Sequence, residues 1–407
     1  MNSVWSSKSN EKNYVPHSCN EMSTPTTTTL VVGAGLAGLE VARRMGGGVT
    51  VLEAARHPGG RVRSVYDPHH LAYEAGPWRV PATHTRVRQL CARLSVALVP
   101  APTPALATPA LPPTAHPGLS TWDVHALQAD SPSVADARDL ATGYADETHA
   151  ASGSAPYLSD ADAYLVAPEG LSSLVEALAE GVNILYDSRV TDVVRHADGY
   201  KVHVSRRTGG NAFHRHVLAC TTLFVCVPPH VFGTWTAFKH AQSVVHAVVP
   251  GALHHVYVQD ADHPRGRHTA QPLVGQVVSS QYPSDWFQAS YSAGRVAHLW
   301  NHLALSDPTR LVQTLRRQVA AAWKWTFGED APWRSHHWPV GYHAWRAVPQ
   351  FDLARAVRTA VAPNPRHLPR LYLAGEAHSS HQAWMEGALE TAALAVAAAA
   401  TDDAVVV

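Results

Sequence analysis

The feature that most constrains the fold is a glycine-rich turn between two short apolar runs near the start of the chain. Residues 30–32 are Leu-Val-Val, residues 33–38 read G-A-G-L-A-G, and a helical pattern continues to residue 45. A second apolar run, residues 49–52, leads directly into Glu53. Strand, G-x-G-x-x-G turn, helix, strand and acid in this order predict a dinucleotide-binding α/β unit, with Glu53 placed to accept hydrogen bonds from a ribose.

Each glycine of this turn has its own physical task. Gly33 permits a sharp turn out of the strand, and Gly35 has no Cβ to keep a pyrophosphate away from the backbone. Gly38 lets the helix lie close to the sheet. The first helical residues, Leu36 and Ala37, bring unpaired N–H groups and the positive end of the helix dipole to the phosphates.

Three further segments add to this pattern. Gly59 and Gly60 precede Arg61, so a second close backbone approach has a cation beside it. Far along the chain, residues 371–377 read L-Y-L-A-G-E-A, and residues 382–389 begin a final helix. In this combination the chain resembles the flavin-containing amine oxidase family, which includes monoamine, polyamine and L-amino acid oxidases.

The resemblance implies FAD as the cofactor. It places Glu376 beside the ribityl and pyrophosphate groups, Val190 against the adenine, and the start of the last helix at the pyrimidine end of the flavin. No cysteine lies near Trp345 in the sequence, so we expect no thioether link and a non-covalent cofactor. The residues expected to contact FAD are Gly33, Gly35, Leu36, Ala37, Gly38, Glu53, Ala54, Arg56, Gly59, Gly60, Arg61, Gly76, Pro77, Trp78, Arg79, Val190, Val227, Gly375, Glu376, Trp384, Met385 and Ala388.

The segment around Arg79 indicates a class of substrate. Residues 76–81 read G-P-W-R-V-P and are similar to the G-P-x-R-x-P stretch of L-amino acid oxidases, in which the arginine binds the substrate carboxylate. The planar guanidinium matches a carboxylate in a bidentate pair. Arg79 is therefore predicted to be a carboxylate clamp, and the alternative is a structural arginine that ties a loop to backbone carbonyls.

Three other residues complete the expected catalytic set. Trp384 takes the position of an aromatic ring that faces the flavin in the family. Trp345 is expected to be its partner, with Tyr342 as second candidate and with ordinary packing as the alternative for Trp345. His255 takes the place of a lysine that family members commonly use in the reaction with oxygen. Because the charge of a histidine is conditional, this departure argues against fast oxidase chemistry and leaves flavin reduction unaffected.

The expected fold class is α/β: a Rossmann-like FAD-binding domain of the GR2 type with an inserted α+β substrate domain on a mixed sheet. At 407 residues the chain is long enough for two domains. The predicted segments are a polar, disordered 1–27, the FAD-binding parts 28–99, 166–229 and 351–401, a Pro/Ala-rich connector with a reduced helical region at 100–165, and the substrate domain at 230–350.

Charge and cysteine content narrow the range of partners. Lys plus Arg and Asp plus Glu are equal at 32 each, so there is no electrostatic case for nucleic acid or an anionic membrane. The 27 histidines are scattered, and no metal is expected. Cys220 and Cys226 lie in apolar strand-like sequence and are expected to be buried thiols. No segment has the pattern of a signal peptide or a membrane span, so a cytoplasmic setting is the default expectation.

The resemblance implies oxidation of a neutral amine by hydride transfer from its α-carbon to flavin N5, followed by imine hydrolysis and reoxidation by O2 to H2O2. The leading hypothesis is an enzyme similar to L-amino acid oxidases, with an amino acid and O2 as its partners. One alternative is a mono- or polyamine oxidase without carboxylate recognition, and another is a flavoprotein without turnover. The sequence leaves the oligomeric state open, a homodimer being one alternative.

Overall fold

The structure is a computed structural model. It describes residues 29–67, 70–102, 164–207, 212–271, 274–346 and 352–405. The segment 1–27 and nearly all of the connector 100–165, for which we predicted disorder and a reduced helical region, lie outside these residues.

Five parallel strands form the central sheet of the first half of the molecule. Their order is β18-β12-β1-β2-β8, so segments from the start, the middle and the end of the chain lie side by side. Nearly every residue of β18, β12, β1 and β2 is buried, as is typical of a parallel sheet that is covered on both faces. The bounds are β1 (Thr29–Val32), β2 (Val49–Leu52), β8 (Ile184–Leu185), β12 (Thr222–Val225) and β18 (Leu371–Leu373).

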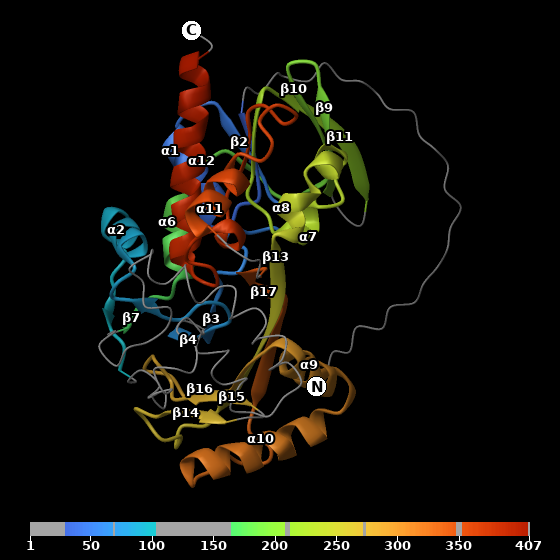
Figure 1. Cartoon of the computed structure of the whole chain (residues 1–407). Coiled ribbons are helices and arrows are strands. Elements are labelled where there is room, and N and C mark those ends of the chain that lie inside the picture. The colour runs from blue at the N-terminus through green and yellow to red at the C-terminus, as the bar shows by residue number, and fades with distance from the viewer. Residues whose placement is uncertain are drawn as a thin grey trace.

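Helices cover one face of this sheet and a second, antiparallel sheet covers the other (Figure 1). Gly46, at φ +78°, follows the last residue of α1 and ends this helix, because a glycine adopts such a positive φ without strain. The layered arrangement buries both sides of the parallel strands and leaves the ends of these strands open. The covering elements are α1 (Leu36–Met45), α6 (Ser172–Ala179), α12 (Met385–Val405), β9 (Ser188–His196), β10 (Gly199–Arg207) and β11 (Phe213–Cys220).

The second half is built on a five-stranded sheet in the order β14-β15-β16-β13-β17. We expected a mixed sheet, and this expectation is wrong, because every pairing in this sheet is antiparallel. The short links from β14 to β15 and from β15 to β16 require two of these pairings to be antiparallel, since a parallel pair needs a long crossover connection. The bounds are β13 (Val248–Gln259), β14 (His268–Gln271), β15 (Gly275–Val278), β16 (Trp286–Ala293) and β17 (Trp333–Trp345).

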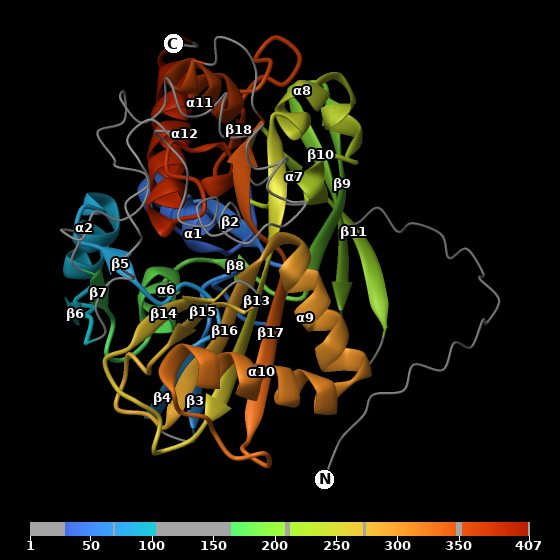
Figure 2. The same ribbon diagram turned by 60° about the horizontal axis from the view of Figure 1, so that its bottom comes forward.

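Helices α9 (Gly294–Ser306) and α10 (Pro308–Trp323) pack on one side of this five-stranded antiparallel sheet (Figure 2). Asp307 caps α10, since its side chain accepts a hydrogen bond from the N–H of Arg310, and Pro308 occupies the first turn. The apolar face of this helix is buried, with Leu311, Leu315 and Val319 in the core and Ala322 partly buried against it.

Among the described residues, no helix combines the length and the apolarity that a membrane span requires.

Smaller elements join the two halves. The remaining elements are β3 (Ser64–Asp67), β4 (His70–Glu74), β5 (Val80–Pro81), α2 (Thr85–Arg93), β6 (Val99–Pro100), β7 (Tyr164–Val166), α7 (Pro229–Phe232), α8 (Gln242–His246), α11 (Leu353–Val361) and the 3-10 helices η1 (Thr236–His240) and η2 (Glu376–His378).

Candidate active site

The carboxyl ends of four neighbouring parallel strands, β18, β12, β1 and β2, open into one cavity of about 340 Å3. Gly375, Val227, Gly33 and Glu53 follow these strands and line the cavity. Ligands of open α/β sheets bind outside the carboxyl ends of the strands. Residues of β13 and β17 close the opposite wall, so the cavity lies between the two halves of the molecule.

The two glycine turns near the start of the chain pack against each other. Gly35 and Gly59 form a parallel bridge, and the N–H of Gly59 donates to the carbonyl oxygen of Ala34 over 2.9 Å. A Cβ on Gly38 would lie 1.9 Å from the carbonyl oxygen of Gly33, so Gly38 is needed for the close approach of α1. A Cβ on Gly35 would meet nothing nearer than 3.9 Å, because the open side of this glycine faces the cavity.

Glu53 lines the same part of the cavity and is held by the backbone. Its Oε2 accepts a hydrogen bond from the N–H of Ala34 over 2.7 Å, and its Oε1 accepts one from the N–H of Ala55 over 2.8 Å. Each carboxylate oxygen can accept a second hydrogen bond. The side chain is therefore fixed and still able to accept hydrogen bonds from ribose hydroxyls.

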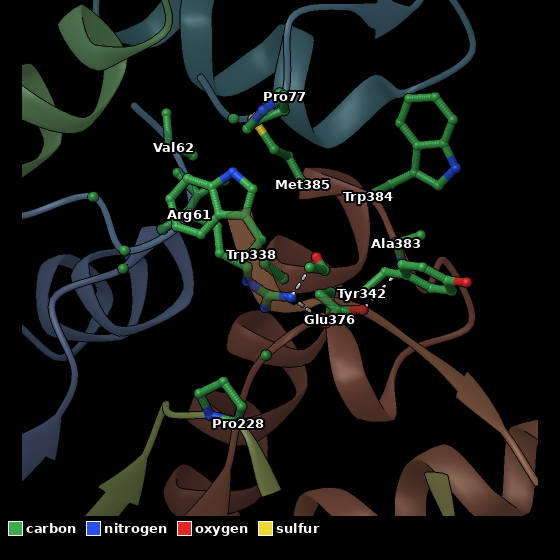
Figure 3. A pocket seen from close by; sticks show the side chains of 18 of the residues that line it. Arg61, Val62, Pro77, Pro228, Trp338, Tyr342, Glu376, Ala383, Trp384 and Met385 are labelled. Atoms are coloured by element: carbon green, nitrogen blue, oxygen red, sulfur yellow. Dashed lines mark hydrogen bonds and ion pairs between the residues drawn. The ribbon is translucent and has the colours of Figure 1, made fainter. Parts of the chain in front are cut away.

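Glu376 is a buried carboxylate at the centre of an ion-pair network. Its Oε1 accepts from Nη1 of Arg61 at 2.6 Å, and its Oε2 accepts from the N–H of Ala383 at 2.9 Å (Figure 3). The same Oε1 lies 2.6 Å from Nδ1 of His343. Burial alone would raise the pKa of Glu376, but Arg61 and His343 hold it well below its ordinary value. Arg61 also donates to the carbonyl oxygen of Gly341 in β17, so the network joins the two halves.

Arg79 is a buried cation in the wall of the cavity. The side chain is 6% exposed, and its Nη1 has no hydrogen-bond partner among the described residues. Its Cζ lies 4.8 Å from the ring centre of Trp78, 4.7 Å from that of Tyr164 and 5.8 Å from that of Trp384. Aromatic rings stabilise a guanidinium but give it no counter-charge. The arrangement can accept an anion from the cavity.

His255 also lines the cavity and is fully buried. Neither ring nitrogen has a hydrogen-bond partner among the described residues, and the ring packs edge-on against Tyr291 at 4.4 Å. Burial, with smaller effects from His336 and His254, lowers the pKa of His255 to about 3. This imidazole is therefore neutral near pH 7 and supplies no fixed positive charge.

The aromatic wall differs in part from the expectation. Trp384 lines the cavity and packs edge-on against His84 at 5.0 Å, whereas Trp345 lies in the core outside it. Trp345 donates through Nε1 to the carbonyl oxygen of Ser379. Tyr342, the second candidate, does line the cavity together with Trp338 (Figure 3). The reason is strand alternation, because Trp345 falls three residues after Tyr342 and faces the opposite side of β17.

A family model described as flavin containing amine oxidoreductase matches residues 36–116 and 133–400, which is most of the chain. The chain belongs to this family. None of the curated proteins compared with it gives a significant match. As a flavin-containing amine oxidoreductase it acts with a flavin cofactor, and the glycine turns, Glu53 and the Arg61–Glu376 pair form a site that suits one.

Five predicted residues of this amine oxidoreductase lie outside the cavity lining. Besides Trp345, they are Gly38, which serves helix packing, and Val190, which is in the core. Ala54 lies in the loop after Glu53, and Arg56 pairs at the surface with Asp187. The other predicted cofactor and catalytic residues line it: Gly33, Gly35, Leu36, Ala37, Glu53, Gly59, Gly60, Arg61, Gly76, Pro77, Trp78, Arg79, Val227, His255, Gly375, Glu376, Trp384, Met385 and Ala388.

Several lining residues were not identified from the sequence. Trp338 and Tyr291 belong to the five-stranded antiparallel sheet. The alternation of side chains along β17 and β16 would have identified them once the register of these strands was known. Ala383 has φ +66°, which is unusual for a residue other than glycine, and no sequence signal indicates it. The residues missed are Val62, Cys226, Pro228, Leu253, Tyr291, Trp338, Val340, Gly341 and Ala383.

Of the expected buried thiols, Cys220 is buried, whereas Cys226 is half-buried and lies in the cavity wall beside Gly33. Burial raises the pKa of the Cys220 thiol to about 12 and that of the Cys226 thiol still further. Both thiols are therefore protonated and unreactive near neutral pH. Among the described residues, no group of three or more His, Cys, Asp or Glu side chains is placed to hold a metal ion.

Proposed function

We propose that this amine oxidoreductase binds FAD non-covalently and oxidises L-amino acids. In the proposed reaction an amino acid, O2 and water give a 2-oxo acid, ammonia and H2O2. When bound, FAD supplies the acceptor for the hydride from the α-carbon. The residues of the chain bind the amino acid, orient its α-carbon and exclude water from the cavity.

The observation that carries this proposal is the buried guanidinium of Arg79, whose Nη1 has no hydrogen-bond partner in the part of the chain that the structure describes. A charge that is removed from water and left unpaired costs several kcal/mol, so such sites hold a counter-charge in their working state. A substrate carboxylate provides that charge and a bidentate hydrogen bond. With the carboxylate fixed on Arg79, the side chain of the amino acid would lie among apolar and aromatic walls that include Trp338 and Trp384.

The test compares two reductants that differ in the carboxylate, L-phenylalanine and phenethylamine. The holoenzyme is mixed anaerobically with each, and bleaching of the flavin is followed for the wild type, for Arg79→Met and for Arg88→Met, an exposed arginine of α2 that serves as control. Arg79→Met should lower the second-order rate with L-phenylalanine about 10²–10⁴-fold, since removal of one partner of a buried ion pair costs about 3–5 kcal/mol. Arg88→Met should leave the rate unchanged.

Other outcomes point elsewhere. If phenethylamine bleaches the wild type at least as fast as L-phenylalanine and Arg79→Met has no selective effect, the protein oxidises amines without carboxylate recognition. If neither these two compounds nor a wider panel of amino acids and amines bleaches the flavin, the protein is a flavoprotein without turnover.

A further inference from the structure

A second, much smaller hollow lies behind Trp78, between the two halves of the molecule. Its volume is about 20 Å3, and residues of β4, β13, β15 and β16 surround it. Trp78 separates this hollow from the main cavity, because it lines both. Gln281 and Tyr282 also line this hollow, and both line a third hollow that opens to the surface at Arg265.

Three buried polar atoms at this hollow have no hydrogen-bond partner among the described residues. They are Nε1 of Trp78, Oε1 of Gln281 and the hydroxyl of Tyr282. Buried polar atoms in folded proteins almost always have a partner, and leaving one without a partner costs free energy. All three residues line one small space, in which a common ligand can satisfy these atoms.

The donor and acceptor types identify that ligand as water. The indole N–H of Trp78 can only donate, and the amide oxygen of Gln281 can only accept. The Nε2 of the same amide donates to the carbonyl oxygen of Ser279 over 2.8 Å. The Tyr282 hydroxyl can do either. An anion would have no donor for the Gln281 oxygen. One water needs about 10–15 Å3 and two to four polar partners, which this hollow provides.

We propose that the hollow behind Trp78 is a binding site for an internal water, through which Gln281 and Tyr282 hold the Trp78 indole and, with it, the Arg79 guanidinium in place. The link to Arg79 is direct, since the Trp78 ring lies 4.8 Å from its Cζ. Tyr282 is thus a positioning residue for carboxylate binding. This last consequence rests on the proposed function of Arg79, whereas the water site itself does not.

The water site is tested by the stability of the FAD-loaded Tyr282→Phe variant. The matched control is Tyr200→Phe, since Tyr200 is also buried, lies in the other half and donates to the carbonyl oxygen of Pro369 over 2.8 Å. With a bound water, Tyr282→Phe lowers the urea midpoint about as much as Tyr200→Phe does, because each substitution removes a satisfied hydroxyl. In a dry hollow the same change removes an unsatisfied hydroxyl, so an unchanged or raised midpoint overturns the water site.

The positioning role is tested by titrating the holoenzyme with benzoate and with its neutral analogue benzamide, followed by flavin absorbance. Tyr282→Phe should weaken benzoate binding at least threefold and leave benzamide binding unchanged. Equal effects on both ligands, or no effect on benzoate, overturn the positioning role. If Arg79→Met retains full benzoate affinity, the carboxylate clamp is wrong, and the urea midpoint of Tyr282→Phe still decides the water site by itself.

Discussion

Glu376→Gln is the substitution that most directly probes the network joining the two halves of the molecule. The wild-type carboxylate is 5% exposed and makes close contacts with Arg61, His343 and the N–H of Ala383. Glutamine has nearly the same shape but no charge. It keeps one acceptor oxygen and places an NH2 group where the second oxygen accepted a hydrogen bond.

The structure allows the size of the effect to be worked out. Removal of one partner of a buried ion pair costs about 3–5 kcal/mol. Arg61 retains 30% side-chain exposure and can be partly hydrated in the variant, which reduces that cost. We therefore expect Glu376→Gln to lower the free energy of unfolding by about 2–3 kcal/mol, or roughly one to two charge-assisted hydrogen bonds.

The lowered pKa of Glu376 also determines how its contribution to stability changes with pH. Because the pKa of Glu376 is lowered in the folded protein, its contribution to stability is present above the ordinary carboxyl pKa and is lost as pH falls toward the folded value. Denaturant unfolding of the wild type and the variant should thus differ by a constant amount from about pH 5 upward, and the difference should shrink below about pH 4.5. A difference under about 0.5 kcal/mol at pH 7, or one that grows as pH falls, would refute this reasoning.

Two further substitutions test other parts of the account. Gly38→Ala places a Cβ 1.9 Å from the carbonyl oxygen of Gly33, so we expect a loss of about 1–3 kcal/mol in unfolding free energy. The control is Gly47→Ala, whose Cβ meets nothing within 4 Å. Equal stability of the two variants would contradict the close approach of α1. His255→Lys introduces a cation where the wild-type imidazole is neutral, so stopped-flow reoxidation of the reduced enzyme by O2 should be at least about tenfold faster, and an unchanged rate would show that charge at this position does not limit the reaction.

The parts of the fold that the sequence predicts are those in which local sequence and function coincide. The G-x-G-x-x-G turn, the Gly59–Gly60 turn and the Gly375–Glu376 turn each carry their own signal, because the backbone there needs glycine. Their meeting at one edge of a parallel sheet follows from the strand order. The cavity-facing residues of β17 are harder to predict, because successive side chains of a strand point to opposite faces and the sequence does not show which face borders the cavity. Trp345 and Tyr342 are both aromatic, and they differ only in that an odd number of positions along β17 puts them on opposite faces.

Contacts between distant segments are the least accessible to sequence reasoning. Tyr164 is one of the aromatic residues around the Arg79 guanidinium although it lies 85 positions further along the chain, and no sequence motif indicates this contact. The antiparallel pairing of β14, β15 and β16 follows from the short links between these strands, which composition does not reveal. Likewise, the fully buried state of His255 could not be known from its position in a strand, yet it decides that the ring is neutral.

The most direct test of the account measures FAD binding to the apoprotein of the wild type and of Gly35→Val. A valine at this position would project into the cavity without meeting protein atoms nearby, since the nearest atom to its Cβ is 3.9 Å away. We predict one tightly bound FAD per wild-type chain, with a yellow flavin spectrum, and a Gly35→Val variant that is as stable as the wild-type apoprotein but fails to bind FAD. A wild-type apoprotein that remains colourless with FAD, or a Gly35→Val variant that binds it with undiminished affinity, would contradict the account.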